Sequence, residues 1–171
     1  MRKLGIILSF IALVVFTDSC TKEKIEELAP LVTQASMSAN INNTTWTTIT
    51  RITKHYTGLH TFVITGTSTS GRVLAITVKG ETTGTFTSST DINDPSAQVG
   101  AVWKPSSSLN YVSKSGSITI SEINTTDSKL TGTFSFEMVN TSDISDVISI
   151  ASGKFDNIKF SVSDSTKSAL Y

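Results

Sequence analysis

The two histidines of the chain are spaced in a way that suits a metal site. His55 and His60 flank Thr57-Gly58, and a two-residue turn at that dipeptide would pair the imidazoles across a hairpin. Directly opposed Cβ atoms in a hairpin lie about 5 Å apart, close enough for their side chains to share an ion. Zinc usually takes three or four ligands, and no Asp or Glu occurs between Arg51 and Val73. His55 and His60 are therefore candidate metal ligands, and the alternative is a solvated loop.

Three aromatic residues are candidates for contact with a ligand. A Trp or Tyr ring combines an apolar face with a polar group at its edge, a combination that suits stacking on a sugar. Trp46, Trp103 and Tyr111 are the residues that we take as ligand-binding candidates. The alternative places both tryptophans in the hydrophobic core.

Catalytic motifs are missing from the sequence. No serine stands in a Gly-x-Ser-x-Gly elbow, which marks one class of hydrolase. A glycosidase needs two carboxyl groups about 5 to 9 Å apart. Glu81, Glu122 and Glu137 are present, but no pattern pairs them. We therefore expect a protein that is not an enzyme and needs no cofactor.

The N-terminal segment has the three parts of a secretory signal. Arg2 and Lys3 are followed by a mostly apolar run from Leu4 to Phe16 and then by a short polar exit. The apolar run is shorter than the roughly 20 residues that a membrane-spanning helix needs. The sequence therefore predicts a signal peptide over residues 1–19.

Cys20, the only cysteine of the chain, directly follows this segment. The segment resembles a bacterial lipoprotein signal, with the small residue Ser19 before the cysteine and Thr17 in a looser form of the motif that is familiar from Bacteroidetes. The resemblance implies cleavage before Cys20 and acylation of its sulfur with fatty acids such as palmitate. The membrane would then be a partner through this anchor, because several acyl chains hold a protein stably. The resemblance to Gram-negative lipoproteins further implies that Thr21, in place of an Asp, favours the outer membrane. The periplasmic side and the surface side of that membrane are both alternatives.

Composition limits the remaining possibilities. Lys and Arg together number 14 and so do Asp and Glu, which leaves no net charge and no basic patch for nucleic acid. Charged residues make up 16% of the chain, against a usual share of about a quarter, and Ser and Thr replace them. The length after residue 19 suits one domain, with a tether over residues 20–35 and a folded domain over residues 36–171.

Hydrophobic alternation predicts an all-β domain. Leu130–Met138 alternates strictly between apolar and polar residues, as a strand with one buried face does. Val73–Val78 is apolar on both faces, which indicates a central strand. Asn42-Asn43 suits a tight hairpin turn, and a bulge at or near Gly153 would explain a change of face in the last strand. About nine or ten short strands predict an antiparallel β-sandwich or a meander barrel.

Four stretches resemble an uncharacterised family of Bacteroidetes lipoproteins: Met37–Trp46, Gly116–Ile120, Leu130–Phe136 and Ser152–Phe155. The resemblance implies an anchored β domain without an assigned activity. We expect an envelope lipoprotein with a non-catalytic binding or scaffolding domain, and its candidate partners are a glycan, a small apolar ligand or an envelope protein. The alternatives are a structural or assembly component of an envelope complex and a carbohydrate-active hydrolase.

Overall fold

Alternation of apolar and polar residues gives this chain strands in place of helices. The computed structural model describes residues 34–89 and 96–164, which contain ten strands and one short 3-10 turn, η1 (Thr57–Leu59). The strands are β1 (Ser36–Ile41), β2 (Thr44–Thr47), β3 (Thr50–Tyr56), β4 (Thr61–Thr67), β5 (Val73–Lys79), β6 (Gly84–Thr87), β7 (Val99–Lys104), β8 (Tyr111–Asn124), β9 (Lys129–Asn140) and β10 (Val147–Ser163).

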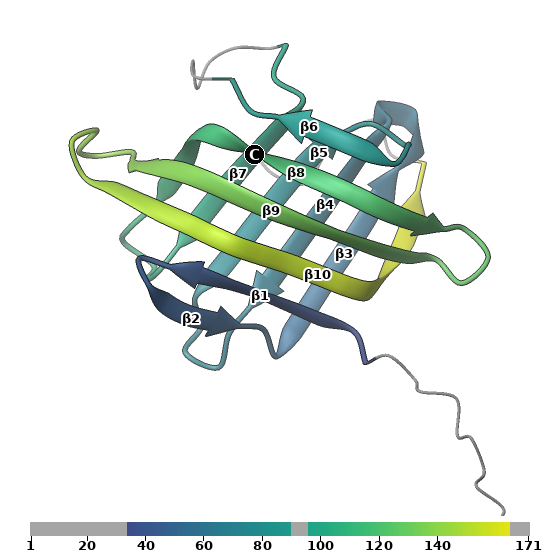
Figure 1. Cartoon of the computed structure of the whole chain (residues 1–171), viewed down its shortest axis with the longest axis horizontal. Coiled ribbons are helices and arrows are strands. Elements are labelled where there is room, and N and C mark those ends of the chain that lie inside the picture. The colour runs from purple at the N-terminus through teal and green to yellow at the C-terminus, as the bar shows by residue number, and fades with distance from the viewer. Residues whose placement is uncertain (1–33, 90–95, 165–171) are drawn as a thin grey trace, which may run out of the picture. The chain divides into compact units, whose positions relative to one another are not determined.

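Seven strands close a barrel, in the order β10, β3, β4, β5, β7, β8 and β9, with β9 returning to β10. A ring with an odd number of strands cannot alternate in direction all the way round, so one neighbouring pair must be parallel. That pair is β10 with β3, in which Phe160 lies opposite Thr53. β1 and β2 continue the sheet beyond β10, and β6 pairs with β8. Figure 1 shows β1, β10, β9 and β8 crossing in front of β3, β4, β5 and β7.

The prediction of an all-β fold is confirmed, and the ten strands agree with the expected number. The structure decides between the two predicted architectures. Because β10 pairs with β3 and β7 pairs with β8, the sheet closes as a barrel and does not separate into the two sheets of a sandwich. Neighbouring strands pair mostly in chain order, as a meander requires, and β6 is the exception within the barrel region.

Inward-facing side chains form the core of the barrel. β9 has the predicted alternation, since every second residue from Leu130 to Met138 is buried while Thr131, Thr133, Ser135 and Glu137 face outward. β5 lies between β4 and β7, which confirms that it is a central strand. A barrel with so few strands has an interior that side chains fill. The largest fully buried side chains are those of Phe62, Phe155, Met37, Ile64, Leu74, Ile76, Ile118, Ile120, Leu130, Met138, Ile150 and Ile158.

Residues with positive φ mark the turns and bulges. Asn42-Asn43, with φ of 46° and 61°, forms the predicted two-residue turn between β1 and β2. β10 contains two register shifts, one between Ile150 and Gly153 and one between Phe155 and Ile158. The second shift explains why Phe155 and Ile158 are both buried although their sequence spacing would place them on opposite faces.

Candidate functional site

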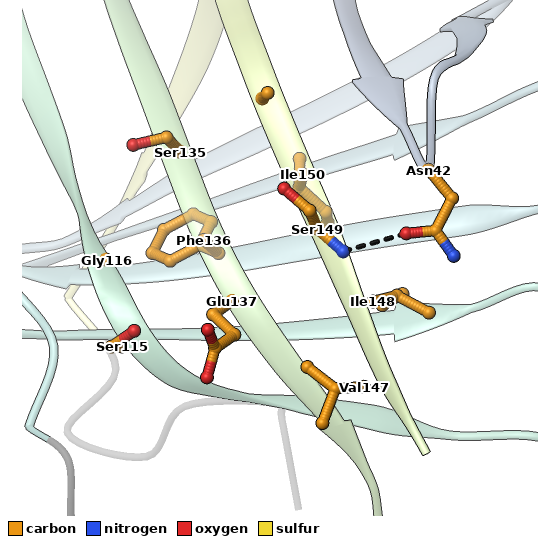
Figure 2. Close-up of a pocket in the computed structure, with 11 residues that line it drawn as sticks. Asn42, Ser115, Gly116, Ser135, Phe136, Glu137, Val147, Ile148, Ser149 and Ile150 are labelled. Atoms are coloured by element: carbon orange, nitrogen blue, oxygen red, sulfur yellow. Dashed lines mark hydrogen bonds between the residues drawn. The ribbon is translucent and has the colours of Figure 1, made fainter.

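A pocket opens on β8, β9 and β10 (Figure 2). Its volume is about 480 Å³, within the range of roughly 300–1,000 Å³ that is usual for ligand sites. It is lined by Asn42, Ser115, Gly116, Ser135, Phe136, Glu137, Val147, Ile148, Ser149, Ile150 and Ala151. We call this pocket the outer groove and take it as the candidate functional site.

A row of polar side chains crosses the outer groove from strand to strand. Ser115 of β8 lies opposite Glu137 of β9, and Glu137 lies opposite Ser149 of β10. Glu137 and Ser149 alternate with buried neighbours and therefore face away from the core, whereas Ser115 follows a bulge in β8 and is half-buried where it lines the groove. Adjacent strands are about 4.8 Å apart, so the row spans about 10 Å. Asn42 extends it, because its side-chain oxygen accepts a hydrogen bond from the Ser149 backbone N–H at 2.9 Å, the dashed line in Figure 2.

The polar side chains of the groove keep much of their hydrogen-bonding capacity. Within the described residues, the hydroxyls of Ser115, Ser135 and Ser149 have no protein partner. Lys114 Nζ lies 3.0 Å from Glu137 Oε1, and both side chains are about half exposed. Such an exposed pair adds little stability, but it offsets the charge of Glu137 and leaves the second carboxylate oxygen available.

Two β-bulges shape the groove. One lies in β8 between Ser113 and Ser115, and the other lies in β10 between Ile150 and Gly153, on either side of β9. A bulge bends its strand and increases the local twist, so the bends together make this part of the surface concave. Gly116 has a φ of 133°, and a Cβ at this position would clash with the carbonyl oxygen of Ser135. Glycine is therefore required where β8 approaches β9.

A row of four valines runs beside the polar row. Val102 lies opposite Val112, Val112 opposite Val139, and Val139 opposite Val147, across β7, β8, β9 and β10. Val139 is buried, at 6% exposed, and Val102 and Val112 are half-buried, whereas Val147 is 43% exposed and lines the groove. The outer groove therefore has an apolar border along one side of its polar row.

The aromatic residues predicted to contact a ligand lie elsewhere. Trp46 and Trp103 are 4% and 3% exposed, and their rings pack edge to face with centroids 5.6 Å apart. Tyr111 is also buried, and its hydroxyl donates a hydrogen bond of 2.7 Å to Asp146, which raises the pKa of the phenol, with burial as the second cause. None of the three lines the outer groove. The alternative of core tryptophans is therefore correct, because both side chains belong to the buried hydrophobic core.

The histidines lie on either side of one carboxylate. The expected pairing of His55 with His60 is wrong, because η1 lengthens the connection between β3 and β4 and His55 lies opposite Phe62. His55 Nε2 and His60 Nδ1 are each 2.7 Å from a different oxygen of Glu81. These hydrogen bonds, that of His60 first, lower the pKa of the Glu81 carboxyl. The three side chains link the β3–β4 connection to the segment after β5.

The described residues contain no group of three or more His, Cys, Asp or Glu that could hold a metal ion. Glu81 occupies one nitrogen of each imidazole, so the second nitrogens lie on the far sides of the rings. Metal binding by His55 and His60 stays a prediction without a preformed site.

The predicted anchor cannot be placed in this fold. The signal peptide over residues 1–19, Cys20 and most of the tether lie outside the described residues, and β1 begins at Ser36. Lipidation of Cys20 stays a prediction. Along residues 34–89 and 96–164, no helix has the length and apolar character that crossing a membrane requires.

Sequence reasoning missed the outer groove. Its serines lie in strands that are rich in Ser and Thr throughout, so composition does not distinguish them. A usable signal was glycine inside a strand, as at Gly116 and Gly153, because such glycines are typical of bulges and of close backbone approach. The register that aligns Ser115, Glu137 and Ser149 depends on those bulges.

The described fold and site define an all-β domain, in which a seven-stranded barrel with three further strands carries a groove on its surface. The chain belongs to the family described as "Domain of unknown function (DUF6252)", which matches residues 33–159. The predicted resemblance to an uncharacterised family is confirmed to that extent. No curated protein and no solved structure matches the chain.

Proposed function

We propose that this chain is a lipid-anchored envelope protein, of the kind found in Bacteroidetes, whose barrel binds a ligand in the outer groove without catalysing a reaction. The observation that carries the proposal is the row of Ser115, Glu137 and Ser149, whose side chains keep free hydrogen-bonding groups in a pocket of ligand size. The anchor rests on the sequence before and at Cys20.

The groove favours binding over hydrolysis. Glu137 is the single carboxylate among the lining residues within 34–89 and 96–164, and Lys114 holds one of its oxygens. Glycoside hydrolysis needs a second carboxyl group across the bond to be cleaved. The barrel interior is the weaker candidate for a binding site, because large apolar side chains occupy it.

Metabolic labelling with a palmitate analogue tests the anchor. The wild-type chain is expected to take up label and to partition with membranes, whereas the Cys20→Ala chain is expected to do neither. Equal labelling of both chains would refute acylation at this cysteine.

A groove-filling variant tests the binding site. Ser135 faces outward, so Ser135→Arg fills the groove without entering the core. Fractions of a cell-envelope extract are added to the full chain in mild detergent, and the unfolding temperature is measured, since a ligand stabilises the state that it binds. We expect one fraction to raise the unfolding temperature of the wild type and of the control Ser161→Ala, but not of Ser135→Arg. The binding proposal fails if no fraction separates wild type from Ser135→Arg.

A structural or assembly role is the second candidate, and the row of four valines favours it. Val102, Val112 and Val147 are at least partly exposed, and exposed apolar side chains that lie side by side on a sheet face are typical of contact with another protein. Val112→Glu would then abolish a crosslinked envelope complex that Ser135→Arg leaves intact, and the opposite pattern would favour the ligand-binding role.

A further inference from the structure

We infer that the outer groove takes a neutral carbohydrate, held through adjacent hydroxyl groups by the row of Ser115, Glu137 and Ser149. This inference rests on the proposed function and names the ligand class of the same site. It depends on the kinds of side chain in the row, on its charge, on its apolar border and on the pairing of the strands around it.

The polar row suits a ligand that both donates and accepts many hydrogen bonds. Each serine hydroxyl can donate and accept, while the free oxygen of Glu137 only accepts. A carboxylate oxygen between two hydroxyls is complementary to neighbouring hydroxyl groups of a sugar. The Asn42 oxygen is already used by Ser149, which leaves its NH₂ group as a further donor at the end of the row.

An apolar ligand does not fit this lining. It would remove three serine hydroxyls and a carboxylate from water without replacing their hydrogen bonds, and burying such groups unpaired is unfavourable. A sugar, in contrast, has apolar C–H groups on its ring faces as well as hydroxyls at its edge. Val147 and Ala151 border the serines of the groove and could contact those C–H groups.

The charge of the groove points to a neutral ligand. Among the described residues that line the pocket, Glu137 is the only charged one, and Lys114 is the cation beside it at 3.0 Å. A phosphate or carboxylate ligand would meet Glu137 and would compete with it for Lys114. The lining residues that the structure describes include no surplus cation that would bind such an anion.

Main-chain pairing with a peptide is also disfavoured. A peptide that adds to a sheet needs an open strand edge. At the groove, β9 is paired on both sides, Asn42 covers β10 at Ser149, and Ser88 donates to Gly116 of β8 at 2.9 Å. The groove therefore presents side chains, and a ligand must be recognised through them.

Saturation-transfer NMR on the full chain in mild detergent tests the ligand class. The probes are glucose, galactose, mannose, N-acetylglucosamine, the α- and β-linked disaccharides of glucose, and one polysaccharide built from each linkage. The variants are Glu137→Gln, Ser149→Ala and Ser135→Arg. The matched controls are Glu122→Gln and Ser161→Ala, which are exposed positions outside the groove. Amide spectra establish that every variant is folded.

We expect at least one sugar to bind wild type and both controls. Glu137→Gln is expected to weaken that binding roughly tenfold, Ser149→Ala about fivefold, and Ser135→Arg to abolish it. Binding of the polysaccharide that is much tighter than that of its disaccharide would identify a polymer as the source of the sugar, and equal binding would identify a free sugar.

Sugar binding that the three groove variants leave unchanged would overturn the inference. The inference would also fail if no sugar bound while an envelope fraction still stabilised wild type but not Ser135→Arg, and the proposed function would then survive. If neither a sugar nor an envelope fraction binds at the groove, both the inference and the proposed ligand-binding function are refuted.

Discussion

Replacement of Gly116 by alanine tests how the outer groove is built. Gly116 lies in β8 with a φ of 133°, a conformation that residues with a Cβ rarely adopt. An added Cβ would clash with the carbonyl oxygen of Ser135 and would crowd Phe136. Gly100 is the matched control, because it is also a strand glycine, has a φ outside that region and has open space where a Cβ would lie, with no atom within 4 Å.

The expected cost of Gly116→Ala has two parts. A residue held in a disfavoured backbone region costs about 1–3 kcal/mol. Overpacking against a backbone that other strands hold in place costs about another 1–3 kcal/mol. Gly100→Ala has neither cost and gains about 0.4–1 kcal/mol, because alanine restricts the unfolded chain. The two variants should therefore differ by about 2–7 kcal/mol in the free energy of unfolding.

Urea unfolding of the full chain in mild detergent measures this difference, with fluorescence of the buried Trp46 and Trp103 as the signal. A Gly116→Ala chain that no longer folds counts as the expected large loss in the free energy of unfolding. The reasoning is refuted if the free energies of unfolding of Gly116→Ala and Gly100→Ala differ by less than about 1 kcal/mol while the slope of that free energy against urea concentration is the same in both. The close approach of β8 to β9 would then tolerate a side chain.

Three further outcomes are expected. Hydrogen bonds from His60 and His55 lower the pKa of the Glu81 carboxyl from its ordinary value of 4.5, so the charged carboxylate stabilises the fold above that value. This contribution is lost as the pH falls through the lowered pKa. In urea unfolding, Glu81→Gln should therefore lose less stability than wild type or Glu122→Gln between about pH 6 and about pH 3, and an identical loss would contradict this. Trp103→Ala should reduce the free energy of unfolding by about 3–5 kcal/mol, because the ring is buried, while the folded variant keeps its ligand. Loss of binding without loss of stability would instead indicate that Trp103 contacts the ligand. Calorimetric titration with zinc should give no stoichiometric binding, whereas one equivalent bound by wild type and lost in His55→Ala and His60→Ala would establish the metal site.

Local patterns predicted the parts of the fold that depend on few residues. The alternation of Leu130–Met138, the turn at Asn42-Asn43 and the central strand Val73–Val78 all appear in the structure. Each depends on the side-chain period of a strand or on the φ preference of two turn residues, which neighbours in sequence determine. The pairing of His55 with His60 failed because it assumed a two-residue turn, and η1 lengthens that connection.

The sequence by itself determined that the folded domain is all-β and which faces of several strands are buried, and it predicts a signal peptide and a lipidated cysteine before that domain. Tertiary structure alone decided that the sheet closes through a parallel pair of β10 and β3, that Trp46 and Trp103 pack against each other, and that Ser115, Glu137 and Ser149 align. The physical reason is that strand alternation is a local property of the chain. Register and closure depend on bulges and on contacts between residues far apart in sequence, and a single bulge changes which residues stand opposite one another.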